Sequence, residues 1–252
     1  MIKRIIKKIF YQIGFEIHKK GTVQEFPIDF DNITTKIIKS TKPFTLTSKE
    51  RNFALIEAVK YVINHEIAGD IVECGVWKGG SVMIICKTLI NLKNQEKEIH
   101  LFDTFEGMTK PTEFDIPSSE KWDASEQFDK LKTGDDSADW CKSGIDEVKN
   151  NVYSTGYNNK KIRFIKGKVE NTLPQFAPEK ISILRLDTDW YESTLHELIH
   201  LFPKLVKGGV LIIDDYGYWK GSKKAVDEYF AKNKSKILLN RIDSTGRIAI
   251  KL

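Results

Sequence analysis

Short apolar runs alternate with longer stretches whose apolar residues recur every three or four positions, along most of the chain. The short runs have the length of buried strands, and the longer stretches have the period of amphipathic helices. Strands are expected within residues 69–75, 98–105, 161–167, 181–187 and 208–215. Helices are expected within residues 45–66, 79–93, 144–157, 194–206 and 222–233, and a turn leads into a short helix at 170–177. This alternation predicts an α/β fold with a doubly wound, mostly parallel sheet and helices on both faces.

The last two apolar runs, 236–242 and 246–252, are separated by the three residues Asp243, Ser244 and Thr245. Such a spacing predicts a hairpin, which would add an antiparallel C-terminal edge to the sheet. Residues 107–140 are polar and acidic, show no clear period, and are interpreted as a lid-like insertion. The stretch 21–45 contains breaking glycine and proline residues and is interpreted as a connector. We therefore expect an N-terminal segment, 1–44, and one catalytic domain, 45–252.

The first twenty residues place isoleucines at helical spacing and lysines on the opposite face. They lack the uninterrupted apolar stretch and the cleavage site of a signal peptide. A basic amphipathic helix of this kind suits peripheral contact with an anionic membrane. It equally suits packing against its own domain or across a homo-oligomer interface, and we favour packing.

Composition narrows the class of protein. The chain has 252 residues, of which 40% are hydrophobic and 30% charged, so it can bury a sizeable core. The net charge of +5 is mild, and no basic face with interleaved aromatic residues indicates a nucleic-acid partner. Three cysteines without C-x-x-C spacing argue against a disulfide framework or a thiolate zinc site. With no apolar run of ~20 residues, a cytoplasmic location is expected, peripheral at the inner membrane surface if the helix binds lipid.

Candidate chemistry lies where the strands end, because open parallel sheets bind ligands outside the carboxyl ends of their strands. Every expected parallel strand ends in a glycine or an acid. The residues concerned are Glu73-Cys74-Gly75, Asp103-Thr104, Gly167-Lys168-Val169, Asp187-Thr188-Asp189 and Asp214-Asp215.

The first strand end, "VECGVWKGGS", is typical of a loop that a ligand approaches closely. Gly75 permits a sharp turn, and Gly79, Gly80 and Ser81 open a helix whose free N–H groups favour an anionic group. The spacing is not the dinucleotide fingerprint G-x-G-x-x-G. Glu73, before the first glycine, favours a cationic ligand group. The alternative interpretation is an ordinary βα turn.

The second strand ends in Asp103, and an acid there commonly binds ribose hydroxyls in nucleoside-binding sheets. The last two parallel strands deliver four acids. Asp187 and Asp189 point to one side if the backbone stays extended, and a turn can bring Asp214 and Asp215 inward. Converging carboxylates without a partner repel one another, and a divalent cation removes that repulsion. All-oxygen ligands favour magnesium, calcium or manganese over zinc. The alternative is helix capping by individual aspartates.

Five motifs in order resemble the macrocin O-methyltransferase family: "GDIVECGVWKGGS", "LFDTFEGM", "GKVENTLP", "LRLDTDWYEST" and "IIDDYGYWKG". The resemblance runs from about Thr45 to the C-terminus. It implies a class I fold that uses S-adenosylmethionine (SAM) and magnesium-dependent methylation of a sugar hydroxyl, in a glycosylated natural product or a surface polysaccharide. The acceptor partner would be a sugar-bearing small molecule or a glycan.

The resemblance also implies roles for residues. Asp187, Asp214 and Asp215 match metal ligands, and Asp189 matches a general base. Glu73, Gly75 and Ser81, together with Gly79 beside them, fall in the loop for the methionine part of SAM. Asp103 matches the acid that binds ribose, and the turn from Gly167 to Val169 lies where adenine would sit. Trp122 and Trp140 are expected in a lid, and Tyr191, Tyr216 and Trp219 in the acceptor pocket.

Two other functions remain open. The D-x-D at 187–189 also resembles the metal site of a glycosyltransferase, or a phosphatase nucleophile, but both leave "VECGVWKGGS" and "DDYG" unexplained. A non-catalytic module that binds sugars or acts as a scaffold is the second alternative. Acids at four of the five strand ends argue against it.

Overall fold

A computed structural model describes residues 6, 10–12, 25–119, 121–233 and 237–252. The amphipathic helix expected over residues 1–20 therefore lies outside the described residues, except for Ile6 and residues 10–12, which are helical. The expectations about membrane contact and oligomerisation through this helix stay predictions.

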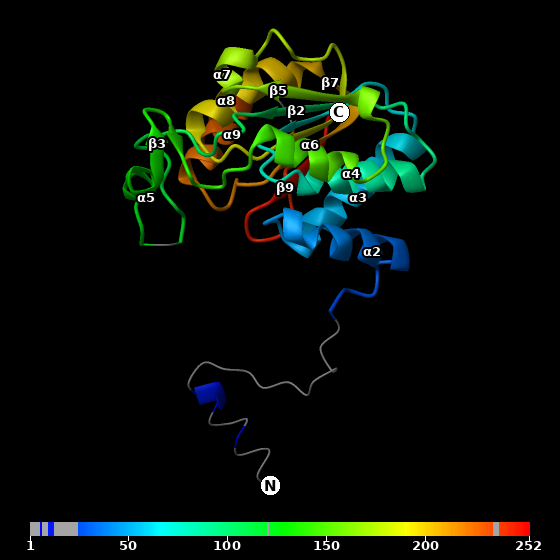
Figure 1. The fold of residues 1–252 in the computed structure, drawn as a ribbon, viewed down its shortest axis with the longest axis horizontal. Coiled ribbons are helices and arrows are strands. Elements are labelled where there is room, and N and C mark those ends of the chain that lie inside the picture. Colours follow the sequence, from blue (N-terminus) through cyan, green and yellow to red (C-terminus); the bar gives the residue numbers. More distant parts are fainter. Residues whose placement is uncertain (1–5, 7–9, 13–24, 120, 234–236) are drawn as a thin grey trace.

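The described residues contain a central seven-stranded sheet in the order β5-β2-β1-β6-β7-β9-β8 (Figure 1). Five neighbouring strands run parallel: β5 (Ile162–Lys166), β2 (Ile99–Asp103), β1 (Asp70–Cys74), β6 (Ile181–Leu186) and β7 (Leu205–Ile213). The strands β9 (Arg247–Ile250) and β8 (Asn240–Arg241) form the antiparallel edge. The predicted fold class and its antiparallel C-terminal edge are thus confirmed.

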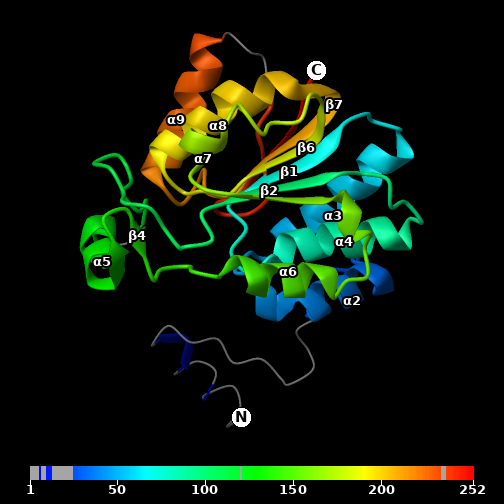
Figure 2. The same ribbon diagram turned by 45° about the horizontal axis from the view of Figure 1, so that its top comes forward.

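Helices cover both faces of the sheet (Figure 2). One layer contains α2 (Asn32–Thr41), α3 (Lys49–Asn64), α4 (Gly80–Asn91) and α6 (Ile145–Tyr153), and the other contains α7 (Val169–Thr172), α8 (Tyr191–Leu201) and α9 (Lys220–Lys232). Each layer buries its own apolar core against the sheet. Ser48 caps α3, because its Oγ accepts from the N–H of Arg51. Within the described part of the chain, no helix has the length and apolarity needed to span a membrane.

The segment interpreted as a connector contains a helix that the sequence pattern did not predict. Helix α2 begins after Asp31, whose side chain accepts from the N–H of Thr34. It buries Ile37 and Ile38 in the same core as α4. The ten-residue helix was missed because its flanking prolines dominate the local pattern.

The insertion at 107–140 has structure of its own. It contains α5 (Ala124–Leu131) and a short hairpin of β3 (Lys132–Gly134) and β4 (Ser137–Ala138), which lie to one side of the sheet (Figure 1). The insertion is anchored by backbone bonds from Ser118 to the Tyr218 carbonyl and from Lys220 to the Ile116 carbonyl, among others. Backbone anchors on the β7–α9 loop therefore hold its base beside the carboxyl ends of the strands.

A buried acid, Asp115, ties the insertion to α8. Its Oδ1 accepts from the N–H of Tyr191 at 2.7 Å, and its Oδ2 accepts from the N–H and the hydroxyl of Thr112. Trp190, the residue at the N-cap of α8, supplies no side-chain cap, so this carboxylate satisfies a free helix N–H and faces the positive end of the helix dipole.

We expect Asp115→Ala to lower the free energy of unfolding by about 1–3 kcal/mol, because buried donors lose their acceptor. Urea denaturation followed by circular dichroism measures the change. Asp129→Ala, at an exposed position of α5, is the matched control and should change it by less than about 0.5 kcal/mol. Equal effects of the two substitutions would show that Asp115 does not anchor the insertion.

Candidate functional site

A cavity of about 740 Å³ opens at the carboxyl ends of the parallel strands. Of the predicted site residues, those that line it are Glu73, Gly75, Ser81, Asp103, Gly167, Val169, Asp187, Asp189, Asp214 and Asp215. Gly79 is not among the lining residues. A Cβ on Gly79 would meet Val148 and Val152 of α6, so this glycine permits close packing of α6 on the loop. The structure therefore brings together every position predicted for the cofactor, the metal and the general base, except Gly79.

The loop after β1 passes close to the loop after β6. Gly75 has a φ of 80°, and a Cβ there would lie 2.0 Å from the carbonyl oxygen of Asp187. No other residue fits this approach without moving the backbone. Gly75 thus holds the two loops that line the cavity in contact with each other.

Glu73 is buried and half satisfied. Its Oε1 accepts from Arg185 at 2.6 Å, while its Oε2 is buried with no hydrogen-bond partner. Burial, offset in part by Arg185, raises the pKa of Glu73 to about 7. The unpaired oxygen at a cavity wall suits a ligand that carries a hydrogen-bond donor or a positive charge.

The Asp103 carboxylate accepts hydrogen bonds from the backbone of neighbouring loops, a role that the sequence did not indicate. Its Oδ2 accepts from the N–H groups of Val76 and Trp77, and its Oδ1 from the N–H of Phe105. Burial raises the pKa of Asp103, and these backbone donors oppose the shift. The carboxylate therefore ties the loops after β1 and β2 together, and Asp103 lines the cavity between them.

The loop after β5 meets the insertion across the cavity. Gly167 and Val169 line the cavity, and Lys168 between them donates to Asp136 of the insertion at 2.6 Å. The insertion thus reaches the end of the cavity that the family resemblance associates with adenine.

Asp187, Asp214 and Asp215 converge as expected. The chain places Asp187 and Asp214 one residue beyond the paired strand ends Leu186 and Ile213. One carboxylate oxygen of each of the three aspartates lies within 4.8 Å of the others. The Oδ2 atom of Asp215 is buried without a partner. Burial is the main cause that raises the pKa of Asp187 and Asp215, and neighbouring carboxylates add to it. The donor set and its spacing fit a hard divalent cation.

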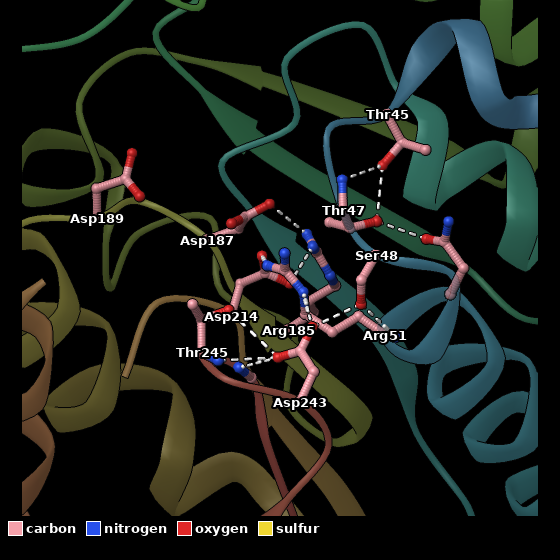
Figure 3. Close-up of polar contacts among 12 residues, drawn as sticks. Thr45, Thr47, Ser48, Arg51, Arg185, Asp187, Asp189, Asp214, Asp243 and Thr245 are labelled. Carbon is pink, nitrogen blue, oxygen red and sulfur yellow. Dashed lines mark hydrogen bonds and ion pairs between the residues drawn. The ribbon is translucent and has the colours of Figure 1, made fainter. Parts of the chain in front are cut away.

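The sequence analysis missed two arginines within this group (Figure 3). Arg185 of β6 donates to Asp187 at 2.7 Å and to Asp214 at 2.6 Å, in addition to Glu73. Arg51 of α3 pairs with Asp214 from the other side. The acids therefore have cationic partners within the chain, which the argument from mutual repulsion did not foresee. A charged residue inside the apolar run "ISILRLD" was the available signal for Arg185; Arg51 carried none.

Asp189 lies apart from the arginine network (Figure 3). Its backbone has a φ of 68°, so the chain turns where an extended strand was assumed, yet the residue still lines the cavity. Trp219 Nε1 donates to its Oδ1 at 3.1 Å. Burial, with the nearby charge of Asp187, raises the pKa of Asp189 to about 7. A carboxylate with this pKa can accept a proton near neutral pH.

Aromatic side chains form part of the cavity wall. Trp122, Trp140 and Trp219 line the cavity and contact one another edge to face. Tyr191 and Tyr216 were expected in the acceptor pocket but do not line the cavity. Their hydroxyls instead donate to Glu228 and Asp227 on α9.

The sequence matches the profile of the macrocin O-methyltransferase (TylF) family over residues 3–249. The chain belongs to this family. The match confirms the resemblance inferred from the five motifs and establishes the chain as an enzyme that transfers methyl groups. It also extends the family to the N-terminal segment, which the motifs did not cover.

Two relatives of known name and one solved structure are O-methyltransferases. The chain is 31% identical over 176 residues, 70% of its length and 63% of the relative's, to demethyldecarbamoylnovobiocin O-methyltransferase of Streptomyces niveus. It is 27% identical over 91% of its length, and 86% of the relative's, to mycinamicin III 3''-O-methyltransferase of Micromonospora griseorubida. Among solved structures, the O-methyltransferase NovP superposes with a TM-score of 0.71 at 28% identity over 82% of each chain.

Proposed function

We propose that this enzyme transfers the methyl group of SAM to a hydroxyl of a sugar, with Mg²⁺ bound at the acid cluster. The observation that carries the proposal is one cavity in which a cofactor-type loop after β1 meets three converging aspartates and a fourth carboxylate. Family membership and the mycinamicin relative, named for methylation of a 3'' position, support the choice of a sugar.

The cofactor is assigned to the side of the cavity formed by the loops after β1, β2 and β5. The unpaired Oε2 of Glu73 suits the ammonium group of the methionine part, and Ser81, in the first turn of α4, lines the same cavity. The ribose is assigned to the part of the cavity lined by Asp103, and the adenine to the part lined by Gly167 and Val169. In this arrangement the sulfonium would lie near the acids.

The metal is assigned to Asp187, Asp214 and Asp215. When bound, a divalent cation lowers the pKa of a coordinated hydroxyl and so makes it a better nucleophile. Asp189, two residues beyond Asp187, is positioned to take the proton of the acceptor hydroxyl, and Trp219 Nε1 donates a hydrogen bond that orients the Asp189 carboxylate. The remaining catalysis is positioning, since an in-line methyl transfer requires the acceptor oxygen to face the sulfonium.

The tryptophan wall suits the apolar face of a sugar ring. We assign the acceptor to a glycosylated natural product or a surface polysaccharide. A D-x-D glycosyltransferase is the alternative activity, and a sugar-binding scaffold the alternative without catalysis.

Calorimetric titration with S-adenosylhomocysteine, in Mg²⁺ and in chelator, tests the cofactor. We expect binding in both buffers, because Glu73 already has a cationic partner in Arg185 and does not depend on a metal. If S-adenosylhomocysteine binds in neither buffer, the methyltransferase proposal is overturned in favour of the glycosyltransferase. Transfer of labelled methyl from SAM to a panel of glycosides and sugar nucleotides, with and without Mg²⁺, then tests the acceptor class and the metal.

A further inference from the structure

Arg51 stands between the acid cluster and the C-terminal hairpin. It lies in the first turn of α3, its side chain is 16% exposed, and it also lines the cavity. One guanidinium nitrogen pairs with Asp214, and Nε donates to Asp243 at 3.0 Å. Asp243 is itself held in the hairpin turn by the N–H groups of Thr245 and Gly246 and by the hydroxyl of Ser48.

This placement puts a fixed positive charge where a metal would act. Arg185 takes Oδ1 of Asp214, and Arg51 takes Oδ2, so both oxygens of this candidate ligand already face cations (Figure 3). The guanidinium of Arg51 also feels Asp187 and Asp215, the other two candidate ligands. A metal ion in this cluster is therefore attracted by three carboxylates and repelled by two arginines, Arg185 and Arg51.

We propose that Arg51 is an internal counter-cation of the acid cluster, which weakens divalent-cation binding and offsets part of the cluster's negative charge when no cation is bound. The inference rests on the metal assignment in the proposed function. Arg51 is a positioning residue: it acts on the candidate metal site through Asp214, and its positive charge opposes the binding of a cation there.

Charge, more than support, is the expected contribution of Arg51. Arg185 bonds Asp214, Asp187 and Glu73 independently, and backbone pairing of β6 with β7 fixes the start of both acid-bearing loops. Removing Arg51 leaves these restraints in place and removes one positive charge. Because the site is largely buried, solvent screens that charge weakly.

The test is Mn²⁺ binding measured by electron paramagnetic resonance, in which bound ions lose the signal of free Mn²⁺. The ion at the cluster is identified as the one whose binding Asp215→Asn abolishes. Arg51→Gln keeps a hydrogen-bond donor for Asp214 but removes the charge, and should tighten Mn²⁺ binding about tenfold. Arg51→Lys keeps the positive charge and should bind Mn²⁺ more weakly than Arg51→Gln does.

Two further variants separate charge from damage. Arg51→Gln combined with Asp243→Asn removes one charge of each sign, so Mn²⁺ affinity should return to within about threefold of the wild type. This neutral pair also protects the test if the single variant does not fold. Lys60→Gln makes the same change in net charge on the same helix, roughly 13 Å further along its axis, and should leave Mn²⁺ affinity unchanged.

Unchanged or weaker Mn²⁺ binding in Arg51→Gln, with the lysine variant behaving likewise, would overturn the inference. If the wild type binds no Mn²⁺ at the cluster while Arg51→Gln does, the inference is supported. If neither binds, the inference and the metal assignment both fail. S-adenosylhomocysteine affinity, measured on the same samples, reports separately on the methyltransferase proposal and should change by less than about threefold.

Discussion

Replacing Arg185 with methionine is expected to lower the free energy of unfolding by about 3–5 kcal/mol at pH 7. The Arg185 side chain is 3% exposed and bonds three carboxylates on three different strands or strand ends. Methionine fills a similar volume but leaves these carboxylates without their shared partner, and buried charge without a partner is costly. For a domain with a typical stability of about 5–15 kcal/mol, such a loss is a large fraction of the total.

The loss should be smaller in acid. Burial already raises the pKa of Glu73 from 4.5 to about 7, and loss of Arg185 removes an interaction that lowers it. The folded wild type already keeps the Glu73 proton up to about pH 7, and the folded variant keeps it to a higher pH, so the extra loss of stability in the variant grows as pH rises above about 7. Urea denaturation at about pH 6 and about pH 8 measures the difference.

Arg163→Met is the matched control, because Arg163 pairs with Glu98 at the solvent-exposed start of β5. An exposed pair contributes little, so a change below about 1 kcal/mol is expected at either pH. A similarly small effect at Arg185 would show that the acids do not need an arginine to stay folded.

The fold was accessible from the sequence because its signals are local and repeated. The parallel strands are apolar runs, and each run is followed by a glycine or an acid, the residue types expected at a ligand site. Helix α2 and the elements inside the insertion (α5, β3 and β4) were not predicted, since α2 depends on packing against α4 and the insertion on anchors such as Asp115. Contacts between segments that are distant in the chain produce no periodic pattern of apolar residues in the sequence.

The acids of the candidate site could be predicted from local patterns in the sequence, but the arginines that pair with them were not predicted. Strand ends identified the acids, since parallel strands carry them to one edge. The charge balance depends on Arg51, which comes from a helix 163 residues away from Asp214 in sequence. Convergent acids alone therefore argue for a metal more strongly than the assembled site does, because the arginines neutralise part of their charge.

Asp189→Asn is expected to reduce the rate of methyl transfer by about 10²–10⁴-fold while leaving S-adenosylhomocysteine affinity unchanged. The amide keeps the shape of the side chain and can still accept from Trp219, but it cannot take a proton from the acceptor hydroxyl. Loss of stability cannot explain such a result, since the substitution removes a buried carboxylate that other acids repel. Transfer of labelled methyl from SAM to a glycoside identified in the acceptor panel measures the rate.

Trp219→Phe separates proton transfer from positioning in the same assay. It retains the aromatic wall but removes the Nε1–H donor to Asp189, so a reduction of only about 3–10-fold is expected, as for the loss of one hydrogen bond. If Asp189→Asn were no slower than Trp219→Phe, Asp189 would position the acceptor without accepting its proton. The base would then have to be sought among the other carboxylates of the cavity, where Asp215 keeps a buried oxygen without a partner.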